Sequence, residues 1–158
     1  YAWRHQARRS LGAAATFAAL ALFCGVFTMA GAAIVRGHSP WIGAEHAASF
    51  AMDLLLYLPV TFVLEEVVFR GALDSYAGGD GIAGWPNFIG AIGVAALWGL
   101  WHMPVIPDSL HVHVVLQLLA VHIPIGVFLA FAWRSGGTLL VPAIVHALVD
   151  AYRNAVLL

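Results

Sequence analysis

Charged residues are scarce in this sequence. Asp, Glu, Lys and Arg together make up 9% of the 158 residues, and lysine is absent. Soluble domains usually carry about 25% charged residues, so too few charges are present here to cover a globular surface in water. The net charge of −1 also excludes the basic field that nucleic-acid binding needs. We therefore expect lipid to cover part of the surface, and we expect no nucleic-acid partner.

Cysteine is nearly absent as well. Cys24 is the only one, so no internal disulfide can form. A single cysteine does not indicate whether the compartment is oxidising or reducing. The chain begins with Tyr1 rather than Met, and we expect it to be part of a slightly longer protein. The apolar run around Cys24 is longer than the ~15 residues of a signal-peptide core, and no clear small-residue cleavage pattern follows it. It is therefore interpreted as a membrane span.

Long apolar stretches are what the sequence does contain. A helix of ~20 apolar residues, rising ~1.5 Å per residue, crosses the ~30 Å hydrocarbon core of a bilayer. Five stretches separated by short connections rich in Gly and Pro meet this requirement: Leu11 to Val35, Ala47 to Tyr76, Pro86 to Val105, Leu110 to Trp133 and Thr138 to Leu158. The sequence predicts an all-α fold, a polytopic transmembrane bundle of five helices forming a single domain over residues 1–158.

The arginines predict an orientation. Three of them precede the first stretch: Arg4, Arg8 and Arg9. Because arginine and lysine favour the cytoplasmic side of a membrane, we expect the N-terminus and the Gly78–Gly81 turn in the cytoplasm. Arg134 agrees with this orientation and Arg36 does not. We expect an integral protein of a bacterial inner membrane.

The second stretch carries three charges at hydrocarbon depth, where each costs roughly 2.5–3.5 kcal/mol. Glu66 and Arg70 are four residues apart, so a structural salt bridge on one helix face accounts for both. Glu65 has no such partner, because Phe69 stands four residues later. Glu65 must therefore face another part of the bundle, and we interpret it as functional.

Two further pairs of polar residues also have helical spacing. Trp98 and His102 share a face of the third stretch, and His146 and Asp150 share a face of the fifth. Taken singly, the first pair fits an interfacial aromatic belt and the second a hydrogen bond between packed helices. With ~1.5 Å rise per residue, ~20° tilts and a kink at Pro59, the pairs and Glu65 reach similar depths. One glutamate, two histidines and one aspartate at one depth indicate a hydrolytic or metal site.

These residues carry a resemblance to a known family. The segment from Leu64 to Gly71, with two glutamates and an arginine four residues later, resembles the first motif of the CAAX protease and bacteriocin-processing (CPBP, or ABI) family. Trp98 to His102 is similar to its second motif and His146 to Asp150 to its third, in the family's order. The resemblance begins near Leu54 and continues to the C-terminus, and we place the motif-bearing core at about 47–158.

The resemblance implies an intramembrane endopeptidase that cleaves a membrane-embedded or lipidated substrate. Glu65 would be the general base that activates water, and His102 would position that water. His146 and Asp150 would stabilise the oxyanion or complete a polar cage.

Around these catalytic residues, Glu66 and Arg70 would order the site. Trp98 stands where the family usually has Phe and adds an N–H donor. Asp150 stands where the prenyl endopeptidases have Asn.

Several alternatives stay open at this point. Two histidines and carboxylates also suit zinc, with His102, His146, Asp150 and Glu65 as ligands, although we favour a metal-free glutamate mechanism. A non-catalytic immunity or scaffold protein would keep the motifs as structure. An ion or proton transporter would use intramembrane glutamate and histidine as a relay. Three other histidines, His111, His113 and His122, could join such a relay, but we interpret them as interfacial or packing residues.

Overall fold

The computed structural model describes residues 11–77, 83–107 and 110–157. Within these ranges the chain is helical with short turns and contains no strand, which confirms the all-α prediction. The α-helices and the one long π-helix are α1 (Leu11–Val35), α2 (Ala47–Val60), η3 (Thr61–Asp74, π), α3 (Ser75–Ala77), α4 (Trp85–Trp101), α5 (Val112–Gly136) and α6 (Leu140–Leu157).

Five helical segments in the described part are long and apolar enough to cross a membrane. They are Leu11–Val35, Ala44–Asp74, Trp85–Val105, Val112–Gly136 and Leu140–Leu157. All five predicted spans are confirmed, with ends shifted by a few residues. The arginines before α1 and the predicted Gly78–Gly81 turn lie outside the described residues.

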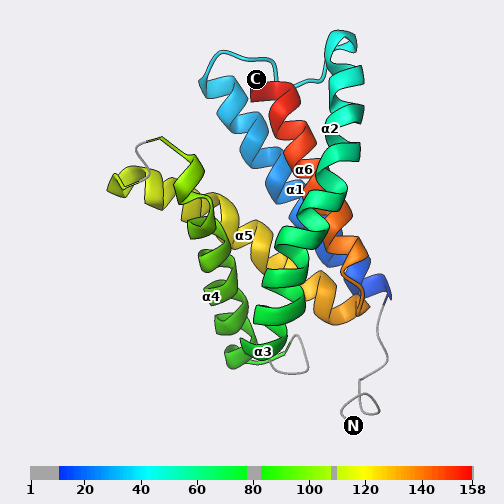
Figure 1. Cartoon of the computed structure of the whole chain (residues 1–158), viewed down its shortest axis with the longest axis vertical. Helices are drawn as coiled ribbons and strands as arrows, with labels where there is room; N and C mark the ends of the chain where they lie inside the picture. Colours follow the sequence, from blue (N-terminus) through cyan, green and yellow to red (C-terminus); the bar gives the residue numbers. More distant parts are fainter. Residues whose placement is uncertain (1–10, 78–82, 108–109, 158) are drawn as a thin grey trace.

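The helices pack in two groups joined by α5. Helix α6 packs against α1 and α2, and α5 packs against both α1 and α4. In Figure 1, α4 and the beginning of α5 form an arm that diverges from α1 and α6, while the end of α5 lies beside them. The bundle is therefore closed at one end, near α3, and open at the other.

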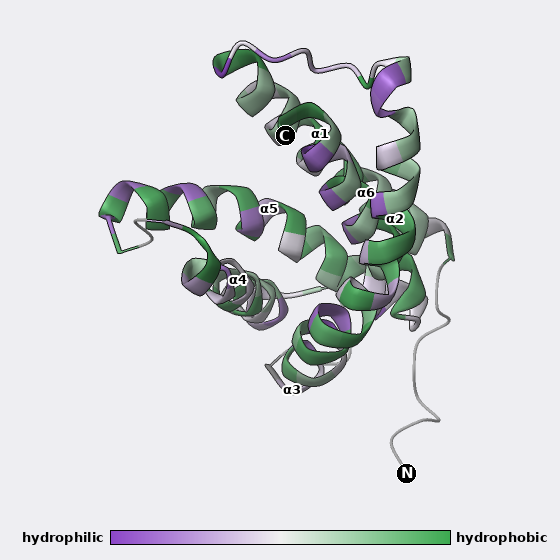
Figure 2. Ribbon diagram, turned by 45° about the horizontal axis from the view of Figure 1, so that its top comes forward, coloured by the Kyte–Doolittle hydropathy of each residue, from purple (hydrophilic) through white to green (hydrophobic). Residues whose placement is uncertain are grey.

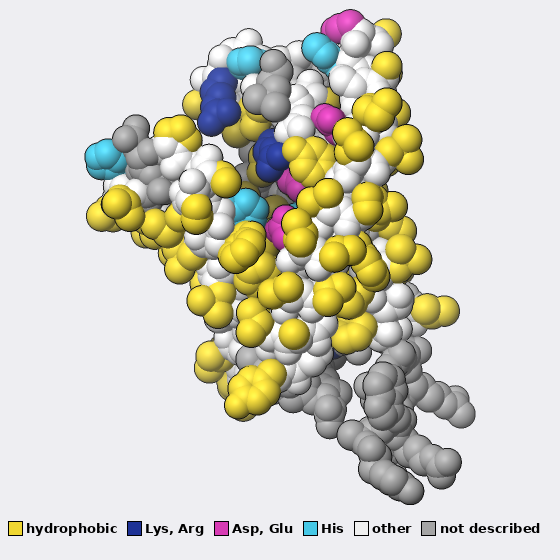
Figure 3. Space-filling model, in the orientation of Figure 1, with side chains coloured by type: hydrophobic (Ala, Val, Ile, Leu, Met, Phe, Trp, Pro, Cys, Tyr) yellow, Lys and Arg dark blue, Asp and Glu magenta, His cyan; other side chains and the backbone are white. Residues whose placement is uncertain are grey.

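The outer surface is apolar. Large side chains such as Phe23, Phe27, Leu55 and Leu97 are more than half exposed. Figure 2 shows that the helices consist largely of hydrophobic residues, and Figure 3 shows hydrophobic side chains over much of the face in view. A protein in water rarely exposes so much contiguous apolar surface. With five spans beneath it, this surface is the lipid-facing side of an integral membrane protein.

The second span changes helix type along its length. It passes from α2 into the π-helix η3 directly after Pro59, where the sequence suggested only a kink. Proline has no N–H to donate, so the regular α-helical pattern of hydrogen bonds is interrupted there. In a π-helix each N–H bonds five residues back, and π-turns are frequent at functional sites. Glu65, Glu66 and Arg70 all lie on this segment.

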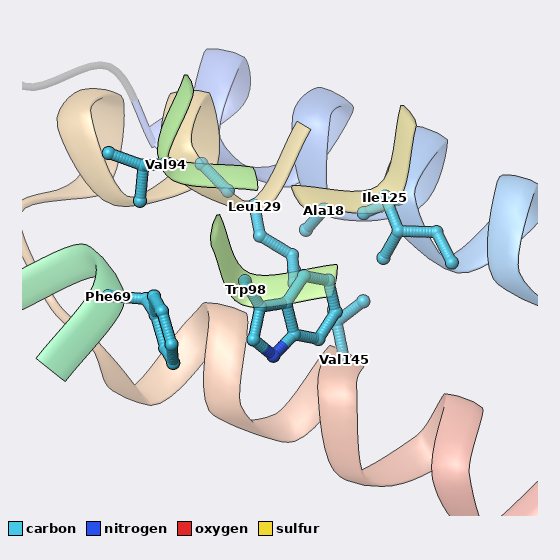
Figure 4. Close-up of a cluster of buried hydrophobic side chains, with 9 residues drawn as sticks. Ala18, Phe69, Val94, Trp98, Ile125, Leu129 and Val145 are labelled. Atoms are coloured by element: carbon cyan, nitrogen blue, oxygen red, sulfur yellow. The ribbon is translucent and has the colours of Figure 1, made fainter. Parts of the chain in front are cut away.

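A buried cluster holds the helices together around Trp98 (Figure 4). Phe69, Leu129 and Val145 bring η3, α5 and α6 against that side chain. Gly126 allows close approach of α5 and α4, because a side chain at this position would run into Ala95. Trp98 is only 3% exposed, so the core fixes its position and that of the groups it contacts.

An arginine ties three segments at the closed end. Arg134, in the last turn of α5, donates from Nε and one terminal nitrogen to both carboxylate oxygens of Asp74 at 2.9 and 2.6 Å. Its other terminal nitrogen donates to the carbonyl of Asn87 in α4 at 2.8 Å. Both charged side chains are almost fully buried. This bidentate contact fixes the end of η3 relative to α4 and α5.

Candidate active site

The structure brings together the four residues that the sequence nominated as catalytic. Oε2 of Glu65, on η3, lies 3.9 Å from Nε2 of His102 at the end of α4 and 3.7 Å from Nε2 of His146 on α6. Nε2 of His146 also lies 3.5 Å from Oδ2 of Asp150, one turn later. Three spans therefore place these four side chains around one point, as their expected depths indicated.

Glu66, the second glutamate, contacts different residues. Glu66 is fully buried, and its Oε1 accepts from Arg70 at 3.2 Å. The same oxygen lies 2.8 Å from Nδ1 of His146. The predicted pair of Glu66 and Arg70 is present, and Glu66 also holds His146 in place. Oε2 of Glu66 and two nitrogens of Arg70 are buried with no hydrogen-bond partner among the described residues.

Trp98 connects the members of the site. Its Nε1 donates to Oε2 of Glu65 at 2.5 Å, so the extra N–H of a tryptophan is used here. The guanidinium of Arg70 lies 4.3 Å from the centre of its ring. The ring of His146 meets it edge-on at 4.8 Å. Glu65, which has no partner in its own helix, is held by a residue from another span.

Hydrogen-bond partners define which ring nitrogens carry hydrogen. Nδ1 of His102 lies 2.9 Å from the carbonyl of Trp98, and a carbonyl only accepts. Nδ1 must therefore donate, and the Nε2 that faces Glu65 is an acceptor in the neutral ring. Nδ1 of His146 likewise donates to Glu66. Because Nε2 of His146 faces the carboxylates of Glu65 and Asp150, a proton or another cation has to stand between them.

A polar network extends from Asp150 toward α2. Arg153 forms an ion pair with Oδ1 of Asp150 at 3.0 Å and donates to the hydroxyl of Tyr57 at 3.4 Å. Asn154 donates to Asp53 at 3.2 Å and to the same hydroxyl at 3.1 Å. This network was not predicted from the sequence. Its signal was the spacing of Asp53 and Tyr57 on one face of α2, opposite Asp150, Arg153 and Asn154 on α6.

The site opens into a cavity of about 580 Å³. Its walls come from the C-terminal parts of α1 and α6, the first half of α5 and the end of α4. In Figure 3, basic, acidic and histidine side chains gather in the hollow between the α5 arm and the rest of the bundle. Polar residues that line it include Trp98, His102, His122, His146, Asp150 and Arg153.

Of the three histidines interpreted as packing residues, one lies at the site. The ring centres of His122 and His102 are 4.5 Å apart. His111 and His113 stack on each other at 5.7 Å near the beginning of α5 and do not line the cavity. His122 does pack between helices, and the residues it packs against, Trp98 and His102, belong to the site. Its place within the span, at a depth near that of His102, was the available signal.

A metal site is not preformed in the described part of the chain, where no three His, Cys, Asp or Glu side chains are arranged to hold an ion. The donor chemistry nevertheless suits zinc. Histidine ligands usually donate their other N–H to a carboxylate or a backbone carbonyl, as His146 does to Glu66 and His102 to Trp98. The Nε2 atoms of both rings are therefore available as ligands.

Fold and site together define an integral membrane protein in which carboxylates and imidazoles cluster between the spans, with the histidines and Asp150 lining a cavity. The chain belongs to the type II CAAX prenyl endopeptidase Rce1-like family, whose family model matches residues 47–152. This match confirms the resemblance to the CAAX proteases and includes all three motifs. No curated protein and no solved structure matches the chain.

Proposed function

We propose that this protein is an intramembrane endopeptidase that hydrolyses a peptide bond of a membrane-embedded or lipidated substrate, with water activated by Glu65. The observation that carries the proposal is the position of the Glu65 carboxylate. It accepts from Trp98 and faces the acceptor nitrogen of His102. Both of these neighbours, with His146, line a cavity of about 580 Å³. Membership of a family of CAAX prenyl endopeptidases supports the same reaction.

The proposed step begins with a water molecule between Glu65 and His102. Glu65 takes one hydrogen of the water and His102 accepts a hydrogen bond from the other, so the oxygen attacks the carbonyl carbon. The C–N bond then breaks, and the proton held by Glu65 passes to the leaving nitrogen. Each group of the site is thereby returned to its initial state.

The developing oxyanion needs donors, and His146 is placed to provide one. Its Nδ1 hydrogen bond to Glu66 fixes the ring, and its Nε2 faces the carboxylates of Glu65 and Asp150. His146 also lines the cavity. Asp150, which forms an ion pair with Arg153, lies 3.5 Å from Nε2 of His146. In this proposal His146 with a proton on Nε2 stabilises the oxyanion, and Asp150 completes the polar cage.

Zinc-assisted hydrolysis is a second candidate. It is favoured by the Nδ1 contacts of both histidines, which leave both Nε2 atoms to bind a cation in place of a proton. The metal would be held by His102, His146, Glu65 and Asp150, and it would supply a Lewis acid and a more acidic water. Metal analysis of the purified protein and of its Asp150→Asn variant separates the two mechanisms. Stoichiometric zinc, lost together with activity in Asp150→Asn, supports the zinc mechanism. Full activity after exhaustive chelation supports the metal-free one.

The decisive experiment is a cleavage assay with purified protein in detergent and a farnesylated peptide ending in a CAAX sequence, beside the native membrane proteome. We expect the wild type to release a peptide fragment and Glu65→Gln to release none. A matched control is Glu45→Gln, since Glu45 is an exposed residue at the beginning of the second span. Equal activity of wild type and Glu65→Gln would leave a transporter or a non-catalytic scaffold as the better interpretation.

A further inference from the structure

His122, on α5, lies against the active site because α4 and α5 pack closely at this point. Gly99 on α4 faces it, and a Cβ at Gly99 would lie 3.1 Å from the Cβ of His122 and 3.4 Å from the Leu118 carbonyl. A larger residue at this crossing would separate α4 from α5. The absence of a side chain at Gly99 therefore allows His122 to reach the residues of the site.

The His122 ring contacts two residues of the site directly. Its centre lies 4.5 Å from that of His102, with an angle of 38° between the rings. It meets Trp98 edge-on at 4.7 Å. His122 lines the same cavity as His102, His146 and Asp150, so a molecule bound there is in reach of its outer atoms.

The hydrogen-bond partner of His122 leaves one nitrogen as an acceptor. Nδ1 lies 2.8 Å from the carbonyl of Leu118, one turn earlier on the same helix. Since that carbonyl only accepts, Nδ1 donates, and Nε2 of the neutral ring keeps an unshared electron pair. Nε2 has no hydrogen-bond partner among the described residues. It is also not one of the unpaired polar atoms that are fully buried. It is an accessible acceptor.

Packing alone does not explain a histidine here. Polar side chains within a membrane span are costly and normally serve a function, and an apolar ring would pack against Trp98 as well. The water between Glu65 and His102 does not need a third acceptor either, because it has only two hydrogens. An extended peptide brings other donors, its backbone N–H groups, and each one left without an acceptor in an apolar cavity is unfavourable.

We propose that Nε2 of His122 binds the substrate by accepting a hydrogen bond from a backbone N–H beside the scissile bond. The proposal rests on the proposed peptide hydrolysis and adds a substrate-binding residue to it. The ligand is defined chemically as an extended peptide whose N–H at one position is free to donate. Prolyl, N-methyl or ester linkages at that position are therefore poor substrates.

The test measures binding of a farnesylated CAAX peptide, with each amide N–H near the scissile bond replaced in turn by an ester oxygen. The Glu65→Gln protein is used, so that the peptide stays intact. We expect one ester position to weaken binding about tenfold, the usual effect of one lost hydrogen bond. The same ester should have no further effect when His122→Leu is added.

Three variants at position 122 test whether peptide binding depends on the acceptor nitrogen or on the ring as a whole. His122→Gln keeps an acceptor near the Nε2 position and should bind the all-amide peptide within a few-fold of the parent. His122→Asn keeps only the group that faces Leu118 and should bind about tenfold more weakly, like His122→Leu. His113→Leu is the matched control, because His113 is a histidine of the same helix outside the cavity. It should bind like the parent.

Two results would overturn the proposal: binding by His122→Leu at parental affinity, or ester effects of the same size with and without His122. If these occur while the wild type still cleaves in a Glu65-dependent way, the proposed function stands and this inference fails. If the His122-dependent binding pattern is present but the wild type releases no fragment, His122 binds peptide and the hydrolytic proposal fails.

Discussion

Glu65 and Glu66 are neighbours in the chain, yet their carboxylates meet different partners. Glu66 is buried between Arg70 and His146, whereas Glu65 is about one-seventh exposed and faces His102, which lines the cavity. A buried carboxylate paired with an arginine is held in place as a structural group, and a carboxylate beside a cavity can reach water. We therefore propose that Glu66 orders the site and that Glu65 transfers the proton.

This difference leads to a prediction about stability. Glu66→Gln should lower the free energy of unfolding by about 3–5 kcal/mol, because Arg70 would remain buried without its partner. Glu65→Gln should unfold close to the wild-type temperature, since it keeps the shape and an acceptor for Trp98. Thermal unfolding of the purified variants in one detergent measures both. A stable but inactive Glu66→Gln together with an active Glu65→Gln would reverse the two assignments.

Trp98 offers a second prediction at this scale. Trp98→Phe restores the residue usual in the family and removes the donor to Glu65. A hydrogen bond to a charged group is worth about 1.5–3 kcal/mol, so kcat should fall roughly tenfold to hundredfold while the protein stays folded. Trp101→Phe is the control, because Trp101 is 61% exposed and lies outside the cavity. Equal kcat values for the two variants would mean that the Trp98 donor plays no part in catalysis.

At the level of elements, α5 joins α4 to the group formed by α1, α2 and α6, and its two ends make different contacts. The first half lines the cavity, whereas the last turn carries Arg134, which binds Asp74 and the Asn87 carbonyl. The contact lies next to the π-helix that carries both glutamates. We infer that it stabilises the register of that segment rather than taking part in the reaction.

The Arg134 contact predicts a pattern of single and double variants. Asp74→Leu alone should destabilise the protein by about 3–5 kcal/mol, because it leaves Arg134 buried without its partner. Adding Arg134→Met should recover much of that loss, since a well-packed apolar pair often replaces a buried ion pair at little cost. Thermal unfolding measures the series. A double variant as unstable as the single one would show that the Asn87 hydrogen bond is the more important part of the contact.

For the whole molecule, the direction in which the chain is inserted determines on which side of the membrane the cavity lies. The cavity is lined by the ends of α1 and α6 and the beginning of α5, all at the end opposite α3 (Figure 1). If the N-terminus is cytoplasmic, as the first three arginines predict, the cavity opens away from the cytoplasm. The direction in which the chain is inserted into the membrane therefore also sets the side from which a substrate would reach the cavity.

Cysteine labelling in intact cells tests that orientation. In a Cys24→Ala background, Ser39→Cys, in the connection after α1, should react with a membrane-impermeant maleimide. Gly79→Cys should react only after the cells are permeabilised. The opposite pattern would place the connection after α1, and with it the mouth of the cavity, in the cytoplasm.

The amino-acid sequence by itself determined the class of this protein. Five apolar stretches are each long enough to cross a bilayer, and charged residues are too few for a soluble surface, so a helical membrane bundle follows from composition and length. The spacing of four between Trp98 and His102, and between His146 and Asp150, also placed each pair on one helix face. These are local properties, and helix geometry alone converts them into structure.

Only the tertiary structure decided which side chains meet. The contact of Trp98 with Glu65 joins residues 33 positions apart, and helical periodicity gives no rotation of one helix relative to another. The π-helix after Pro59 and the close approach of α4 and α5 at Gly99 set how the helices are rotated against one another. The close approach at Gly99 is what brings His122 into contact with the site. The partners of each polar group depend on packing between helices, which a pattern along one helix does not contain.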